Sequence, residues 1–182
     1  MSIEPPASAY DMGHAVEAEA LATFAVLVDN EPGVLHRVVG LFAARGYNIE
    51  SLTVAETDPS AHTSRITIVT RGTPHVLAQI EAQLQKMVST RHVQNVTKDP
   101  NGVERELALI KVRGVGVERV EALRIADIFR ARVIDTTIES FIFELTGAPS
   151  KIAKFVDLMR PLGLVEVSRT GVLSIDRGVE TL

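Results

Sequence analysis

The chain passes from an apolar run into an amphipathic helix at the segment Asp29-Asn30-Glu31-Pro32-Gly33-Val34-Leu35. In front of this segment, residues 23–28 are apolar without helical spacing, which predicts a short buried strand. Behind it, a helix is predicted that ends at Gly46-Tyr47-Asn48. Its apolar stripe consists of Val34, Leu35, Val38, Leu41 and Phe42. The segment is therefore the junction between a strand and a helix.

The start of this predicted helix is suited to a small anion. We expect Asn30 to cap the helix, Pro32 to fit its first turn, and Gly33 to let a ligand approach the backbone. The first N–H groups of a helix have no intrahelical partner and carry partial positive charge, so a carboxylate is the natural guest. A capped helix after a strand is also an ordinary structural feature, and the segment alone does not decide between the two interpretations.

The composition narrows the classes of protein that fit. With 182 residues, the chain is long enough for one medium domain or two small ones. It has no cysteine, which excludes disulfides, thiol catalysis, iron–sulfur clusters and thiolate zinc sites. A net charge of −4 disfavours a nucleic-acid partner. Because no apolar run is long enough to span a bilayer and no signal peptide is recognisable, we expect a cytoplasmic protein without a membrane partner.

A strand and helix order repeats along the chain. After the first helix, residues 49–56 and 64–71 read as two antiparallel strands. Gly72-Thr73-Pro74 offers a cap and a first-turn proline for a second helix, and residues 92–97 read as a final strand. The inward stripe of that helix consists of Val76, Leu77, Ile80, Leu84 and Met87. The first unit therefore has the order βαββαβ.

The same order begins again after a polar segment rich in turn residues, Lys98-Asp99-Pro100-Asn101-Gly102. Strands are predicted over 106–112, 133–136, 141–145 and 164–168. A helix over 117–130 is expected to turn Val117, Val120, Ile128 and Phe129 inward. A second helix begins at Pro149 and carries Ile152, Phe155, Val156 and Met159 on one stripe.

Two tandem βαββαβ units predict an α+β protein made of two ferredoxin-like domains. The predicted division is a disordered leader (1–21), a first domain (22–98), a linker (99–103), a second domain (104–175) and a tail (176–182). In this fold one face and both edges of each sheet are left uncovered, so we expect at least a homodimer.

No catalytic constellation is recognisable in the sequence. The five histidines lie in different elements without metal-ligand spacing, so no metal site is predicted. Serines and threonines in the predicted strands, such as Ser51 and Thr53, have no evident base. Gly114-Val115-Gly116 fails as a dinucleotide fingerprint because Arg119 stands at the third glycine position. An RNA-binding domain of this fold would need aromatic strands and a basic surface, which are missing here.

Several motifs resemble the small, regulatory subunits of acetolactate synthase, also called acetohydroxyacid synthase. The first unit resembles the amino-acid-sensing ACT domain of that family, and the resemblance covers about residues 22 to 178. The matching motifs are Asn30-Glu31-Pro32-Gly33-Val34-Leu35-His36-Arg37, Gly40-Leu41-Phe42, Arg45-Gly46-Tyr47-Asn48-Ile49-Glu50-Ser51-Leu52-Thr53-Val54, Val103-Glu104-Arg105-Glu106-Leu107 and Glu166-Val167-Ser168-Arg169-Thr170-Gly171.

The resemblance implies a non-catalytic subunit without catalytic residues or a cofactor of its own. It would bind the large, catalytic subunit, raise its activity, and confer feedback inhibition by valine or another branched-chain amino acid. Thiamine diphosphate, Mg²⁺ and FAD would belong to the catalytic partner only. A stand-alone amino-acid sensor that acts on another protein is the alternative.

The resemblance also implies which residues hold the effector. Asn30 and the backbone of Gly33, Val34 and Leu35 would hold it from one subunit. Asn48 and Ile49 would reach it from the other subunit of a dimer. Each residue also has a structural explanation: Asn30 as a helix cap, Asn48 as a left-handed residue and Ile49 as part of the core.

Overall fold

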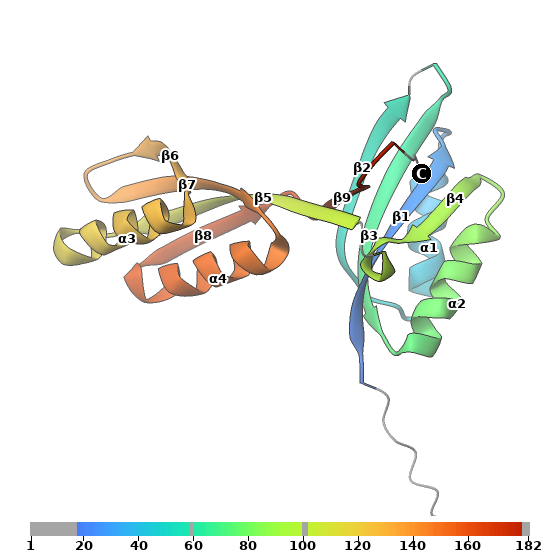
Figure 1. The fold of residues 1–182 in the computed structure, drawn as a ribbon, viewed down its shortest axis with the longest axis horizontal. Helices are drawn as coiled ribbons and strands as arrows, with labels where there is room; N and C mark the ends of the chain where they lie inside the picture. The colour runs from blue at the N-terminus through green and yellow to red at the C-terminus, as the bar shows by residue number, and fades with distance from the viewer. Residues whose placement is uncertain (1–17, 59, 100–101, 180–182) are drawn as a thin grey trace, which may run out of the picture.

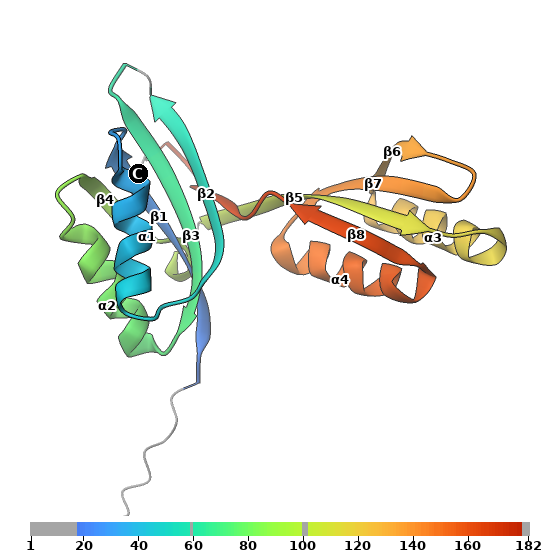
Figure 2. The same ribbon diagram turned by 180° about the vertical axis from the view of Figure 1, so that it is seen from behind.

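The computed structural model describes residues 18–58, 60–99 and 102–179, which form two βαββαβ units (Figure 1). The first unit has a four-stranded antiparallel sheet in the order β2-β3-β1-β4. Both of its helices lie on the sheet face that points away from the second unit (Figures 1 and 2). Its elements are β1 (Ala20–Asp29), α1 (Val34–Ala44), β2 (Ile49–Asp58), β3 (Thr63–Gly72), α2 (Pro74–Gln85), β4 (Thr90–Asn95) and the 3-10 turn η1 (Val96–Lys98).

The second unit repeats this arrangement with the sheet order β6-β7-β5-β8. One further strand, β9, pairs with the first residues of β5 and was not predicted. The elements are β5 (Gly102–Arg113), α3 (Gly116–Phe129), β6 (Arg132–Thr136), β7 (Ser140–Gly147), α4 (Pro149–Met159), the 3-10 turn η2 (Arg160–Leu162), β8 (Leu164–Arg169) and β9 (Leu173–Asp176). The fold class of two tandem ferredoxin-like units is therefore confirmed.

Three segments that were predicted to lie outside the two domains contain strand residues in the structure. β1 begins at Ala20, inside the predicted leader, whose residues 1–17 lie outside the described ranges. β5 begins at Gly102, inside the predicted linker 99–103. β9 ends at Asp176, the first residue of the predicted tail. The linker is thus partly strand because Gly102 to Arg105 pair with β9.

The core of the first unit forms between its sheet and its two helices. Phe24, Val26 and Val28 alternate along β1, are fully buried, and face the helices. The register pairs Phe24 with Ile68 and Val26 with Ile66, so the two strands present one apolar surface. Helix α1 adds Val34, Val38 and Phe42, and α2 adds Leu77, Ile80 and Leu84.

The predicted caps of the two helices have different outcomes. Thr73 caps α2, because its hydroxyl accepts a hydrogen bond from Val76 N at 3.4 Å, and Pro74 is the first helical residue, as predicted. The prediction that Asn30 caps α1 is wrong. Gly33 holds the cap position with φ 85° and no side-chain cap bond. A turn closed by Val34 N and the Glu31 carbonyl, 3.2 Å apart, places Asn30 too early in the chain.

Helix α4 has the predicted orientation, whereas α3 does not. Ile152, Phe155, Val156 and Met159 of α4 are all buried. In α3, Val117 and Ile128, predicted inward, are 85% and 76% exposed, and Val120 is exposed as well. The buried residues are Ala122 and Ala126, because small side chains let the helix pack close to the sheet.

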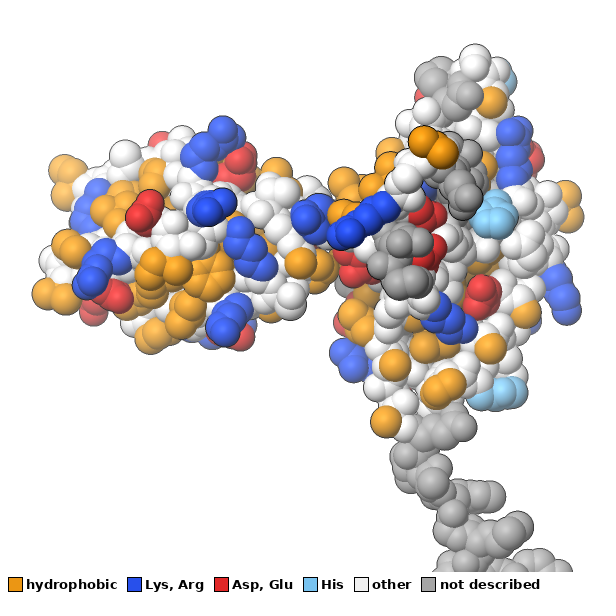
Figure 3. All heavy atoms as spheres, viewed as in Figure 1, with side chains coloured by type: hydrophobic (Ala, Val, Ile, Leu, Met, Phe, Trp, Pro, Cys, Tyr) orange, Lys and Arg blue, Asp and Glu red, His pale blue; other side chains and the backbone are white. Residues whose placement is uncertain are grey.

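The corrected orientation of α3 leaves apolar side chains on the surface of the second unit. Orange side chains are spread over this unit on the face drawn in Figure 3. Of the predicted inward residues of α3, only Phe129 packs against the core, with its ring 5.3 Å from that of Phe155. None of the helices in the described ranges has the length and apolarity needed to cross a bilayer.

The orientation of α3 can be tested with two substitutions on its opposite sides. Ala126→Leu should overpack the core and lower the free energy of unfolding by about 1–3 kcal/mol. Ile128→Ala should change it by no more than about 0.5 kcal/mol, because the side chain is exposed. Urea unfolding followed by circular dichroism measures both. A large loss for Ile128→Ala with none for Ala126→Leu would contradict the orientation.

Candidate functional site

The residues predicted to hold an effector lie at the two ends of helix α1. Asn30 and Gly33 precede the helix, and Asn48 and Ile49 follow it. The helix has 11 residues and is therefore about 16 Å long. A free amino acid is much shorter than that. The structure thus does not bring the two predicted halves of the site together within one chain.

The first half offers backbone donors at the start of α1. Val34 N donates to the Glu31 carbonyl, whereas the N–H groups of Gly33, Leu35 and His36 have no hydrogen-bond partner within the described residues. Gly33 has φ 85°, a conformation that favours glycine. These N–H groups and the helix dipole place partial positive charge at this end of α1, which favours a carboxylate.

The side chains around these donors have separate roles. Val34 is 6% exposed and belongs to the core, so only its backbone faces outward. Leu35 is 38% exposed. Asn30 is exposed, and its amide Nδ2 donates to Glu56 Oε1 at 3.1 Å. Because a carboxylate only accepts, this bond leaves the Asn30 amide oxygen available as an acceptor.

Glu56 is a residue of this region that the sequence analysis missed. It lies 26 positions after Asn30, near the end of β2, and no local pattern connects the two residues. Their hydrogen bond places the loop in front of α1 beside the end of β2. Only the folding of β2 against β3 brings Glu56 there.

The second half begins where α1 returns to the sheet. Asn48 has an exposed side chain, while its backbone carbonyl accepts a hydrogen bond from Thr70 Oγ1 at 2.6 Å. Thr70 is fully buried, so the backbone at Asn48 is fixed to β3. The side chain of Ile49 packs against the core. A β-bulge lies between Ile49 and Ser51.

Strand β2 connects the two halves along one edge of the sheet. It is an outer strand, with β3 as its neighbour among the described strands. It begins directly after Asn48, and its end lies beside Asn30 through Glu56. One copy of β2 therefore has half of the predicted site at each of its ends.

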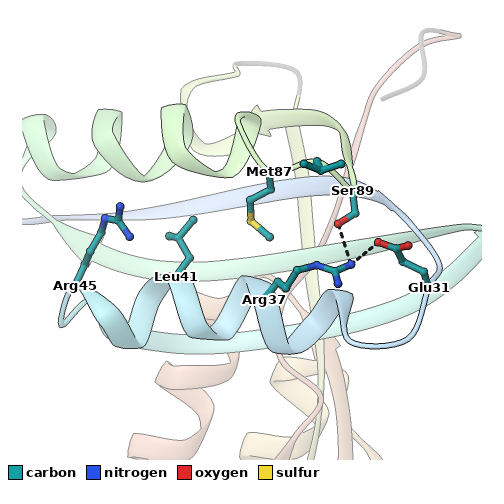
Figure 4. A pocket seen from close by; sticks show the side chains of 7 residues that line it. Glu31, Arg37, Leu41, Arg45, Met87 and Ser89 are labelled. Atoms are coloured by element: carbon teal, nitrogen blue, oxygen red, sulfur yellow. Dashed lines mark hydrogen bonds and ion pairs between the residues drawn. The ribbon is translucent and has the colours of Figure 1, made fainter.

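A cavity of about 490 Å³ lies on the other flank of α1, toward α2 (Figure 4). The Arg37 guanidinium donates to the Glu31 carboxylate and to Ser89 Oγ at one end. Leu41 and Met87 form an apolar middle, and Arg45 lies at the far end. The residues lining this cavity do not include any of those predicted to hold the effector. In the three described ranges, no three His, Asp or Glu side chains converge as a metal site would need.

Comparison with known proteins identifies both units. The family model described as an AHAS small subunit-like ACT domain matches residues 24–92, and the model for the small subunit of acetolactate synthase matches residues 105–178. A probable acetolactate synthase small subunit from Archaeoglobus fulgidus is 47% identical over 156 residues, which are 86% of this chain and 96% of that protein. The small subunit of acetolactate synthase isozyme 3 from Escherichia coli is 45% identical over 154 residues, which are 84% of this chain and 93% of that protein.

A solved structure agrees with these sequence matches. The acetolactate synthase small subunit from Thermotoga maritima superposes with a TM-score of 0.76 at 38% sequence identity. The superposition covers 88% of this chain and 99% of that one. With the tandem fold and the two family models, it confirms the resemblance read from the sequence. This chain therefore belongs to the regulatory small subunits of acetolactate synthase, and its first unit is an ACT domain.

Proposed function

We propose that this protein binds a branched-chain amino acid between the ACT domains of two copies and thereby regulates a catalytic large subunit of acetolactate synthase. On this proposal it also activates that subunit, and valine is the first candidate effector, with leucine and isoleucine next. The observation that carries the proposal is the position of the two predicted half-sites at opposite ends of α1 and of edge strand β2.

A two-fold pairing of β2 would complete the site. If two copies of β2 pair antiparallel, the start of one strand lies beside the end of the other. Asn48 of one chain then lies near Asn30 of its partner, and the symmetry creates two equal sites. The exposed edge supports this pairing, because Val54 of β2 is 45% exposed.

The flank of α1 next to β2 also supports pairing. Arg37 and Leu41 of α1 face the cavity on the α2 side. By helical spacing, Leu35 and Val39 lie on the opposite flank, and they are 38% and 37% exposed. A second copy at this edge would cover these two apolar side chains.

The groups at the half-sites match the parts of a free amino acid. Its carboxylate fits the N–H groups of Gly33, Leu35 and His36 at the start of α1. Its ammonium fits the amide oxygens of Asn30 and Asn48, with the Glu56 carboxylate adding negative charge nearby. Its aliphatic side chain fits apolar surface such as that of Leu35.

Inhibition requires more than binding. An effector shifts an equilibrium only by its difference in affinity between two states, typically about 1–3 kcal/mol for allosteric coupling. A site shared between two subunits provides such a difference, because closing the site changes how the subunits pack. On this proposal thiamine diphosphate, Mg²⁺ and FAD are held by the catalytic partner alone.

Calorimetric titration of the pure protein tests effector binding directly. We expect heat on titration with L-valine, weaker or comparable heat with L-leucine and L-isoleucine, and none with D-valine, whose reversed stereochemistry misplaces the side chain. No heat and no thermal shift with any of the three L-amino acids would contradict the proposal. Amino-acid binding without co-purification of a large subunit would instead indicate a stand-alone sensor.

A bulky residue at position 48 should separate inhibition from activation. Asn48→Phe should keep the activation of the large subunit and lose inhibition by valine, because the exposed side chain fills the site without disturbing the core. Assays of acetolactate formation with and without valine measure both. Equal loss of activation and inhibition would show that Asn48 is structural.

Arg45→Gln is the matched control for Asn48→Phe. Arg45 is exposed near the same end of α1 but lines the cavity toward α2, so inhibition should be retained. Loss of inhibition in Arg45→Gln, but not in Asn48→Phe, would move the effector site to that cavity.

Complementation tests whether the site is shared between two chains. Asn30→Ala and Asn48→Ala should each weaken valine binding by about 10- to 100-fold, the effect of losing a hydrogen bond to a charged group. When the two variants carry different tags, are co-expressed and are purified on both tags, each heterodimer has one intact site and one doubly altered site. Calorimetry should then recover wild-type affinity at about half the wild-type stoichiometry. No recovery would place both residues in one chain's site, or in none.

A further inference from the structure

Edge strand β2 continues from the predicted effector segment directly into a contact with the second domain. Ser51 Oγ accepts a hydrogen bond from Val172 N at 3.2 Å. Thr53 Oγ1 donates to the Val172 carbonyl at 3.1 Å. Both backbone groups of Val172 are thus held by hydroxyls of one strand. We call Ser51 and Thr53 the hydroxyl clamp.

The hydroxyl clamp lies very close to Gly171, the residue before Val172. Gly171 has φ 87°, and a Cβ there would lie 2.5 Å from Ser51 Oγ and 3.0 Å from Thr53 Cγ2. A side chain there would have to displace Ser51 Oγ, and the positive φ also favours glycine. Val172 itself is only 7% exposed. The connection between β8 and β9 therefore lies directly against β2.

The held segment is also fixed to the sheet of the second domain. Thr170 N donates to the Leu107 carbonyl at 3.0 Å, and Leu107 N donates to Thr170 Oγ1 at 3.2 Å. Arg169 Nε donates to Glu106 Oε1 at 2.7 Å, and its Nη2 binds the other oxygen of that buried carboxylate. A shift of Val172 would therefore act on β5 and β8.

The strand that carries the clamp also carries the edge at which a second copy would pair. Among the described strands only β3 pairs with β2, and the other edge of β2 is the one that the proposed function assigns to a second copy. The bulge between Ile49 and Ser51 interrupts its pairing between the effector segment and the clamp. A bulge is a place where the register and the direction of a strand can change.

We propose that the hydroxyl clamp couples effector binding at Asn48 and Ile49 to the position of the second domain, with Gly171 leaving the space that this contact needs. The proposal rests on the proposed function, because it describes how occupancy of that site reaches the rest of the molecule. The two hydroxyls do not hold the effector. They position the second domain relative to the ACT domain.

A separate contact keeps the two domains together when the clamp is removed. Residues of η1 in the ACT domain contact both β5 and β9, independently of Ser51 and Thr53. The chain also continues through β5 from one domain to the other. Neither Ser51 nor Thr53 belongs to either hydrophobic core. A variant without the clamp should therefore fold.

The test is the double variant Ser51→Ala/Thr53→Val in the full chain, combined with the large subunit. We expect activation of the large subunit and the affinity of the isolated chain for valine to be retained. The valine concentration for half-inhibition should rise at least about tenfold, within the usual range of allosteric coupling. In the wild type, valine should also slow hydrogen exchange in residues 164–176, and this effect should be lost in the variant.

Two further variants serve as controls. Thr57→Val removes another hydroxyl from β2. That hydroxyl donates to the Thr63 carbonyl, which belongs to the ACT domain and not to the second domain, so inhibition should stay as in the wild type. Thr53→Ser keeps the hydroxyl that donates to Val172, so it should keep the coupling. Loss of inhibition in Thr53→Ser would show that the methyl group, and not the hydrogen bond, is required.

The outcomes separate this proposal from the proposed function. A wild type that binds no amino acid contradicts the proposed function itself. A wild type that binds valine without any exchange response in residues 164–176 overturns the coupling. The coupling is also overturned if the double variant is inhibited like the wild type, or if it loses valine binding, which would place the hydroxyls in the effector site.

Discussion

The burial of β1 on both faces is the constraint on which the arrangement of the site depends. Phe24, Val26 and Val28 face the helices, while Thr23 and Ala25 on the other face are also buried. Thr23 N donates to Thr97 Oγ1 of η1 at 2.8 Å. Buried backbone groups need hydrogen-bond partners, so a strand buried this deeply is best satisfied by a neighbouring strand on each edge. β3 and β4 pair with it, and β2 is left as an outer strand.

On the proposed function, this arrangement makes regulation depend on the assembly of two copies. Helix α1 separates the loop at Asn30 from the segment at Asn48 by its whole length, so the groups proposed to hold an amino acid are divided between two places. The outer strand β2 runs between the same two places. Symmetric pairing along that strand is the simplest geometry that would join the carboxylate donors of one copy to the amide of another. Binding at such a site is necessarily coupled to how the copies pack.

The same strand also reaches the second domain. The β5 and β9 ribbon covers part of the sheet face that the helices leave open, and Ser51 and Thr53 hold the connection that leads into it. The predicted effector segment and the interdomain contact therefore share one strand with a bulge between them. An ion pair between Arg169 and the buried Glu106 then fixes the far side of that connection. Removing Arg169 would leave the buried Glu106 carboxylate uncompensated, which is costly.

Local patterns in the sequence determined the order of the elements, the cap of α2 and the packing of α4. Thr73 and Pro74 start a helix through contacts within one turn, and Ile152, Phe155 and Met159 define a single stripe, so no distant residue is needed to interpret them. The family motifs indicated the regulatory class for the same reason, because they lie in continuous segments.

Only the tertiary structure decided the features that depend on distant residues. α3 has apolar residues on several sides, and the space available above the sheet selected Ala122 and Ala126 for the core. Asn30 bonds to Glu56 instead of capping α1, and Ser51 and Thr53 meet Val172, because the pairing of β2 with β3 and the return of β9 bring together residues that are far apart in the chain.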